Sequence, residues 1–68
     1  MSMKYKLELG AYRNKRFIDG TTLTKEYADD NAAKGWKDQT VTDTLRYYHE
    51  VAYKLTDEDG RIVAENTV

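Results

Sequence analysis

Hydrophobic and polar residues alternate most clearly between residues 44 and 55, which read TLRYYHEVAYKL. A period of two is typical of a β-strand that turns one face toward a core. We therefore expect one regular strand over this stretch. The same parity places Arg46 and Tyr48 on the opposite, open face of the sheet. The positions expected to face the core are Leu45, Tyr47, His49, Val51, Tyr53 and Leu55.

A second alternating segment lies at the N-terminus, where Tyr5, Leu7 and Leu9 alternate with charged residues. It predicts another strand with one inward and one outward face. The polar stretch YRNKRF (residues 12–17) then predicts a turn. The segment FIDGTT (residues 17–22) is consistent with a short return strand that ends at Asp19-Gly20.

The pattern changes to that of an amphipathic helix between residues 22 and 35. Thr22 or Thr24 would cap its start, acidic residues fill its first half, and Gly35 would end it. The apolar side is thin, so this helix needs a sheet to pack on. Its members are Leu23, Tyr27, Ala28 and Asn31.

Asp59-Gly60 between two apolar runs predicts the turn of a β-hairpin. Two registers remain open. A turn with a glycine bulge would bury Val63, whereas a two-residue turn would bury Ile62 and Ala64. Opposite charges that meet across the strands favour the two-residue turn. These pairs are Glu58 with Arg61 and Lys54 with Glu65.

Together the elements predict a small α+β domain that spans residues 1–68. We expect a two-layer sandwich, in which an antiparallel sheet of three or four strands carries one helix on one face, in the order β-(β)-α-β-β. The chain has 68 residues, no cysteine and no proline. Its core must therefore rest on apolar burial and hydrogen bonds, unless a second copy or another partner adds surface.

The charge and hydropathy of the chain disfavour two classes of partner, namely nucleic acid bound by an overall basic field and membranes. The formal net charge is −1, and 34% of the residues are charged, so no overall basic field exists to attract nucleic acid. The N-terminus, MSMKYKLELG, has no continuous apolar run and resembles neither a signal peptide nor a membrane span. We expect a cytoplasmic protein with no membrane partner.

The residues that most catalytic and metal sites need are scarce. His49 is the sole histidine, which excludes catalytic triads and zinc sites built on several histidines or cysteines. We expect it to be neutral and hydrogen-bonded within the fold. A calcium loop over residues 55–66 would begin with Leu55 and end with Asn66, neither of which is a suitable ligand. We predict a non-enzymatic protein with no catalytic, metal or cofactor site.

The turn over residues 12–17 is the best candidate for binding nucleic acid. Arg13, Lys15 and Arg16 lie close together, and the flanking aromatics Tyr12 and Phe17 could stack on bases. Arg46 and Tyr48 on the open face of the sheet would extend this surface. Three basic residues in a turn are, however, most often part of a solvated loop.

Six tyrosines and one tryptophan are many for this length, and tyrosine, tryptophan and arginine are frequent in the energetic centres of protein interfaces. In size and order of elements the chain looks like small phage and mobile-element proteins, including anti-CRISPR inhibitors. This likeness implies an inhibitor or adaptor that covers a protein partner in the host cytoplasm. The alternative is a weak nucleic-acid-binding protein that uses the basic turn at residues 13–16 and the open face of the sheet. The predicted partner-binding residues are Tyr48, Arg46, Tyr12, Arg13, Lys15 and Arg16.

Overall fold

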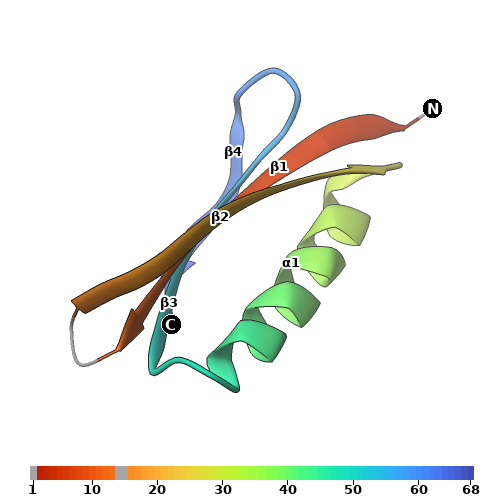
Figure 1. Ribbon diagram of the computed structural model, residues 1–68. Helices are drawn as coiled ribbons and strands as arrows, with labels where there is room; N and C mark the ends of the chain where they lie inside the picture. The colour runs from red at the N-terminus through yellow and green to blue at the C-terminus, as the bar shows by residue number, and fades with distance from the viewer. Residues whose placement is uncertain (1, 14–15) are drawn as a thin grey trace.

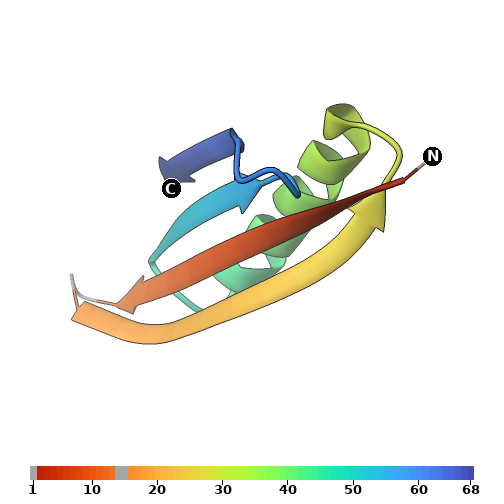
Figure 2. The same ribbon diagram turned by 90° about the horizontal axis from the view of Figure 1, so that it is seen from above.

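The computed structural model describes residues 2–13 and 16–68, and the side chains of residues 11–19 lie outside this description. The strands form one antiparallel sheet in the order β2-β1-β3-β4. Helix α1 packs on one face of it, which confirms the predicted two-layer α+β fold (Figure 1; Figure 2). The elements are β1 (Met3–Arg13), β2 (Arg16–Tyr27), α1 (Asp30–Leu45), β3 (Glu50–Thr56) and β4 (Ile62–Thr67).

The core lies between the sheet and α1, and β1 runs through its centre. Leu7 of β1 lies opposite Leu23 of β2 on one side and opposite Leu55 of β3 on the other. The predicted burial of Leu7, Val51 and Leu55 is confirmed, since each is fully buried, whereas Tyr53 is half-buried. The buried apolar residues are Tyr5, Leu7, Leu9, Ala33, Val41, Val51 and Leu55.

The predicted helix over residues 22–35 has the wrong bounds. Residues up to Tyr27 belong to β2, which is far longer than the expected return strand, because pairing with β1 overrides their helical periodicity. The helix begins at Asp30, where the carboxylate of Asp29 accepts a hydrogen bond from the Ala32 amide at 2.9 Å. Gly35 lies within the helix and does not end it.

The predicted strand over residues 44–55 is wrong in its first half. Helix α1 continues to Leu45, and β3 begins only at Glu50. Val41 is 6% exposed and anchors the last turns of the helix on the sheet, which stabilises a helical conformation for a stretch rich in β-branched residues. As a result Tyr47 is 72% exposed rather than buried, and His49 is exposed as well.

The β3–β4 hairpin closes with a glycine-bulge turn, which was the less favoured alternative. Gly60 has a φ of 85°, a conformation that glycine adopts without strain. Its amide donates to the carbonyl oxygen of Asp57 at 3.0 Å, and the Asp57 amide donates to the carbonyl oxygen of Arg61 at 3.0 Å. The predicted pairing of Glu58 with Arg61 is therefore wrong.

A second irregularity restores the predicted register farther along the hairpin. Thr56 lies opposite Ile62, but Leu55 lies opposite Ala64, so Val63 is an extra residue in β4. The predicted pairing of Lys54 with Glu65 is confirmed. Ile62, which was expected to be buried, is 47% exposed, while Val63 and Ala64 pack against the core.

Candidate functional site

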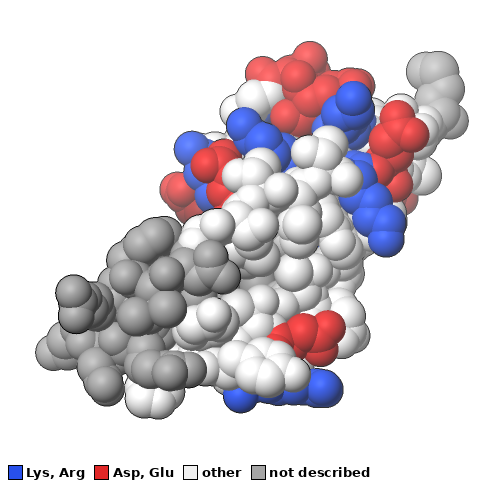
Figure 3. Space-filling view, in the orientation of Figure 1, with Lys and Arg blue, Asp and Glu red and all other residues white. Residues whose placement is uncertain are grey.

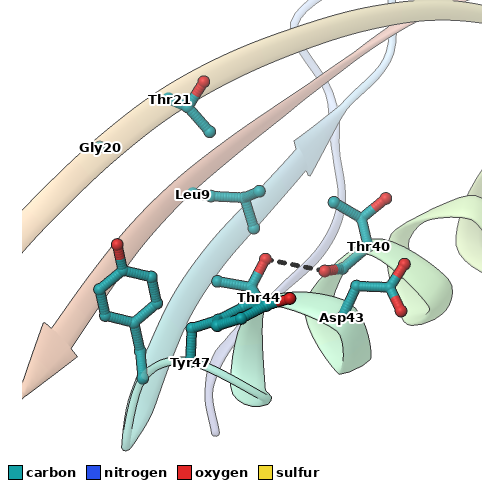
Figure 4. A pocket seen from close by; sticks show the side chains of 8 residues that line it. Leu9, Gly20, Thr21, Thr40, Asp43, Thr44 and Tyr47 are labelled. Carbon is teal, nitrogen blue, oxygen red and sulfur yellow. Dashed lines mark hydrogen bonds between the residues drawn. The ribbon is translucent and has the colours of Figure 1, made fainter.

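A hollow of about 340 Å³ lies between the sheet and the C-terminal half of α1, and we call it the groove. Figure 4 shows Leu9 of β1 and Thr21 of β2 on one side, with Thr40 and Thr44 of α1 on the other. Its volume is at the small end of the range for ligand pockets, about 300–1,000 Å³. The lining residues are Leu9, Gly20, Thr21, Thr40, Asp43, Thr44, Tyr47 and Tyr48.

The helical wall of the groove presents few hydrogen-bond donors. The Thr40 hydroxyl donates to the carbonyl oxygen of Trp36 at 2.8 Å, and the Thr44 hydroxyl donates to the carbonyl oxygen of Thr40 at 2.8 Å. Because both hydroxyl protons are used inside the helix, they are not available to an occupant of the groove. This wall therefore suits an apolar or aromatic group better than a strongly polar one.

The end of α1 positions two tyrosines at the mouth of the groove. The amides of Tyr47 and Tyr48 both donate to the carbonyl oxygen of Thr44, at 3.0 and 3.3 Å, so the chain turns tightly after Leu45. Tyr47 is 72% exposed, whereas Tyr48 is half-buried. A rigid ring that is already exposed loses little conformational freedom when a partner covers it.

Arg46 and Tyr48 do not lie on the open face of the sheet, which corrects the placement predicted from parity. Parity requires a regular strand, and residues 46–49 form the irregular connection between α1 and β3. Arg46 follows the helix as its C-terminal cap, and its guanidinium lies 3.9 Å from the carboxylate of Asp43. Both side chains are largely exposed, so this ion pair contributes little stability.

The predicted basic turn lies at the same end of the sheet as this connection. Arg13 ends β1, Arg16 begins β2, and these two positions pair in the hairpin. Tyr12 pairs in register with Glu50, the first residue of β3, which follows the two tyrosines closely along the chain. Lys15 is outside the described residues, as are the side chains of Tyr12, Arg13 and Arg16.

The open face of the sheet, opposite α1, carries balanced charges. Lys4 lies opposite Glu26, and Lys54 lies between Glu8 and Glu65 in the register of the strands. The described residues of this face include no aromatic side chain, so it offers bases nothing to stack on in that part of the chain. The open-face component of the predicted nucleic-acid surface is therefore absent among the described residues.

A second polar cluster joins the other end of α1 to the hairpin turn. The Tyr5 hydroxyl donates to Asp30 at 2.7 Å, and Arg61 donates to Asp30 at 2.8 Å and to Asp57 at 3.0 Å. The hydrogen bonds from Arg61 and Tyr5 lower the pKa of Asp30 below its usual value. Burial, together with the bond to Asp30, raises the pKa of Tyr5 to about 12. The groups in this cluster satisfy one another, so we assign it a structural role.

The part of the chain that the structure describes contains neither a cluster of metal-binding side chains nor a membrane-spanning helix. No three His, Cys, Asp or Glu side chains there are grouped so as to hold a metal ion. Within residues 2–13 and 16–68, no helix has the length and apolar character that crossing a membrane would require.

The chain matches no known protein family, and neither a curated protein nor a solved structure is detectably similar to it. Functional inference therefore rests on the chemistry of the groove itself. Tyr48, a predicted partner-binding residue, lines the groove together with residues that were not predicted as site residues, namely Leu9, Thr21, Thr40, Thr44 and Tyr47. Asp29, a residue type preferred at helix N-caps, was the signal that could have placed the start of α1.

Proposed function

We propose that this protein is a non-enzymatic binding module that acts as an inhibitor or adaptor by covering the surface of a protein partner. The observation that carries the proposal is Tyr47, which is 72% exposed beside the half-buried Tyr48 at the mouth of the groove. Exposed aromatic rings next to an apolar hollow are characteristic of interface hot spots.

The lining of the groove supports binding rather than catalysis. Its one carboxylate, on Asp43, is about half exposed and lies near the guanidinium of Arg46, where water screens it. The other lining residues are three threonines, two tyrosines, one leucine and one glycine, none of which carries a formal charge at neutral pH. The likeness in size and element order to small anti-defence proteins of phages, inferred from the sequence alone, would make this protein an inhibitor whose partner is a component of the host cell.

The partner should insert an aromatic or aliphatic side chain into the groove, because the helical wall has used its hydroxyl protons internally. Replacing Tyr47 with alanine removes the exposed ring and should cost about 2 kcal/mol of affinity, roughly thirtyfold. The fold should remain intact, since Tyr47 is not part of the core.

The test is affinity capture from host lysate on immobilised protein, with and without nuclease. Tyr47→Ala is compared with Ile62→Ala, a matched truncation of an exposed residue on β4, away from the groove. A protein that the wild type and Ile62→Ala retain after nuclease, and that Tyr47→Ala loses, supports the proposal. Equal capture by all three proteins overturns it, and capture that nuclease abolishes points to the nucleic-acid alternative.

A further inference from the structure

The two edges of the sheet are protected to very different degrees. An exposed edge strand can pair with another chain, and proteins usually prevent this with short edges, bulges or charges. Strand β4 has 6 residues, an extra residue at Val63 and a charge at Glu65. Strand β2 has 12 residues and forms the opposite edge (Figure 2).

The middle of β2 has no protective charge. Residues 20–24 (GTTLT) are all exposed and all uncharged. Figure 3 shows an uncharged band across the middle of the face that β2 and α1 form, with a large group of charged residues toward the end of the molecule where α1 begins and a smaller group where α1 finishes. Within the described part of the chain, the hydrogen bonds of residues 20–27 go to β1 alone. The outward backbone groups of this segment are therefore open to another strand.

We propose that a second copy of this chain pairs with this edge, β2 against β2 in antiparallel orientation, around a two-fold axis at Leu23. Leu23 is 38% exposed, and the axis places the two leucines opposite each other. In this register Lys25 meets Thr21 of the other copy, and Glu26 meets Gly20. No like charges are opposed within residues 20–26.

A second copy fits this edge better than a charged partner does. The segment offers β-branched threonines, which pair well across strands when they face one another, and this pairing places Thr22 opposite Thr24 of the other copy. A net charge of −1 gives two copies little reason to repel each other. A 68-residue domain with a small core also gains from burying more surface.

Self-pairing would change the shape of the candidate site. An antiparallel pair of identical strands has its two-fold axis perpendicular to the sheet, so both helices lie on the same face of one eight-stranded sheet. Gly20 and Thr21 of β2 line the groove of each copy. The two grooves would then adjoin across the paired β2 strands and form one cleft between the two helices. This inference follows from the edge strand and does not depend on the proposed function.

Light scattering and a cysteine crosslink test the pairing directly. The wild-type protein should have twice the mass of the 7.9 kDa chain at about 100 μM. Because the chain has no cysteine, Leu23→Cys introduces one thiol, and its two copies across the axis would lie within disulfide reach. Mild oxidation should crosslink Leu23→Cys, whereas Thr67→Cys on the β4 edge should stay uncrosslinked. A monomeric wild type, or equal crosslinking of the two variants, overturns the proposal.

Two charge variants test the register. In Thr22→Lys/Thr24→Glu, opposite charges meet across the axis, and each new charge also faces an opposite charge on β1, at Glu8 and Lys6. This dimer should be at least as tight as that of the wild type. In Thr22→Lys/Thr24→Lys, like charges meet, and the dimer should weaken at least tenfold. Equal dimer affinities for the two variants would contradict the register. If Thr22→Lys/Thr24→Lys fails to fold, the dimer affinity of Thr22→Lys/Thr24→Glu and the crosslink of Leu23→Cys still test the pairing.

The two proposals fail in different ways. Tyr47→Ala should bind the partner weakly but keep the mass of a dimer, since Tyr47 is not on the β2 edge. A monomeric protein that still loses its partner on Tyr47→Ala would overturn the self-pairing alone. A dimer with undiminished capture by Tyr47→Ala would overturn the proposed function alone.

Discussion

Arg61 donates a hydrogen bond from its guanidinium to the Oδ2 oxygen of Asp30 at 2.8 Å, which joins the β3–β4 turn to the first turn of α1. The other oxygen of Asp30 accepts the hydroxyl of Tyr5 from β1 at 2.7 Å. Three elements that are distant in sequence thus meet at one carboxylate. The behaviour of the protein toward acid and base should depend on this meeting point.

Acid should weaken the fold through Asp30 and Asp57. Hydrogen bonds from Arg61 and Tyr5 hold the pKa of Asp30 below its ordinary value of 3.8. Burial acts to raise the pKa of Asp57, but hydrogen bonds from Arg61 and from the Asp59 amide outweigh it and lower the pKa. The stability from these ionised groups is present above the ordinary pKa and is lost as the pH falls through the lower folded values.

Urea unfolding measured from about pH 7 down to about pH 2 checks this expectation. The variant Arg61→Met removes the cation that both carboxylates bind. Its free energy of unfolding should be lower than that of the wild type at neutral pH and should fall less steeply in acid. Parallel curves for the two proteins would contradict the role given to Arg61.

Base should weaken the fold through Tyr5. Its pKa rises from 10.0 to about 12 because the ring is buried and the hydroxyl binds the Asp30 carboxylate. The corresponding stability is present below pH 10 and is lost as the pH rises toward 12, since the unfolded chain ionises first. Tyr5→Phe should be less stable at neutral pH but lose less stability over this alkaline range. Unfolding followed by circular dichroism at several alkaline pH values measures both effects.

The two glycines at positions 35 and 60 should respond oppositely to alanine. Gly35 is exposed within α1, and a Cβ added there would meet no atom within 4 Å, so Gly35→Ala should stabilise by about 1 kcal/mol. Gly60 has a φ of 85°, so Gly60→Ala should destabilise by about 1–2 kcal/mol even though space is available. Thermal melts of the two variants make the comparison, and a shift of the same sign in both would show that the turn or the helix is misplaced.

Leu55 should be one of the most sensitive positions in the chain. It is fully buried against Leu7, so Leu55→Ala leaves a cavity and should cost about 2–5 kcal/mol, enough to threaten folding in a domain of this size. Ile62→Ala provides the control. Because Ile62 is 47% exposed, this truncation should lower the free energy of unfolding much less. Urea denaturation midpoints of the two variants make the comparison, and equal midpoints would contradict the assignment of Leu55 to the core.

The fold class could be predicted because the alternation in β1 and β3 is produced directly by burial. Leu7, Val51 and Leu55 face the helix, and their charged neighbours Lys6, Glu50 and Lys54 are exposed. The hairpin turn at Gly60 could also be predicted from the sequence, because few residues other than glycine accept its backbone conformation.

The helix could not be placed because its sequence is locally ambiguous. Residues 22–27 have a helical period, yet they pair with β1. The threonines at positions 40, 42 and 44 favour a strand, yet they lie in α1. The contacts that decide both cases, such as Leu23 opposite Leu7, connect residues far apart in the chain. Because the predicted helix ended too early, Tyr47 and Tyr48 were assigned to a strand, whereas they directly follow the end of α1. The groove that they line could therefore not be predicted from the sequence.

The central position of β1 has a consequence for the order in which the protein can fold during synthesis. Leu7 pairs with Leu23 soon after β2 is made, but its second neighbour, Leu55, is made only after α1 and most of β3. Until then the nascent chain holds a hairpin whose apolar side lacks both β3 and much of the core. Folding of this domain can therefore be completed only after β3 and β4 have left the ribosome, and premature termination within β3 would leave the β1 edge open for aggregation.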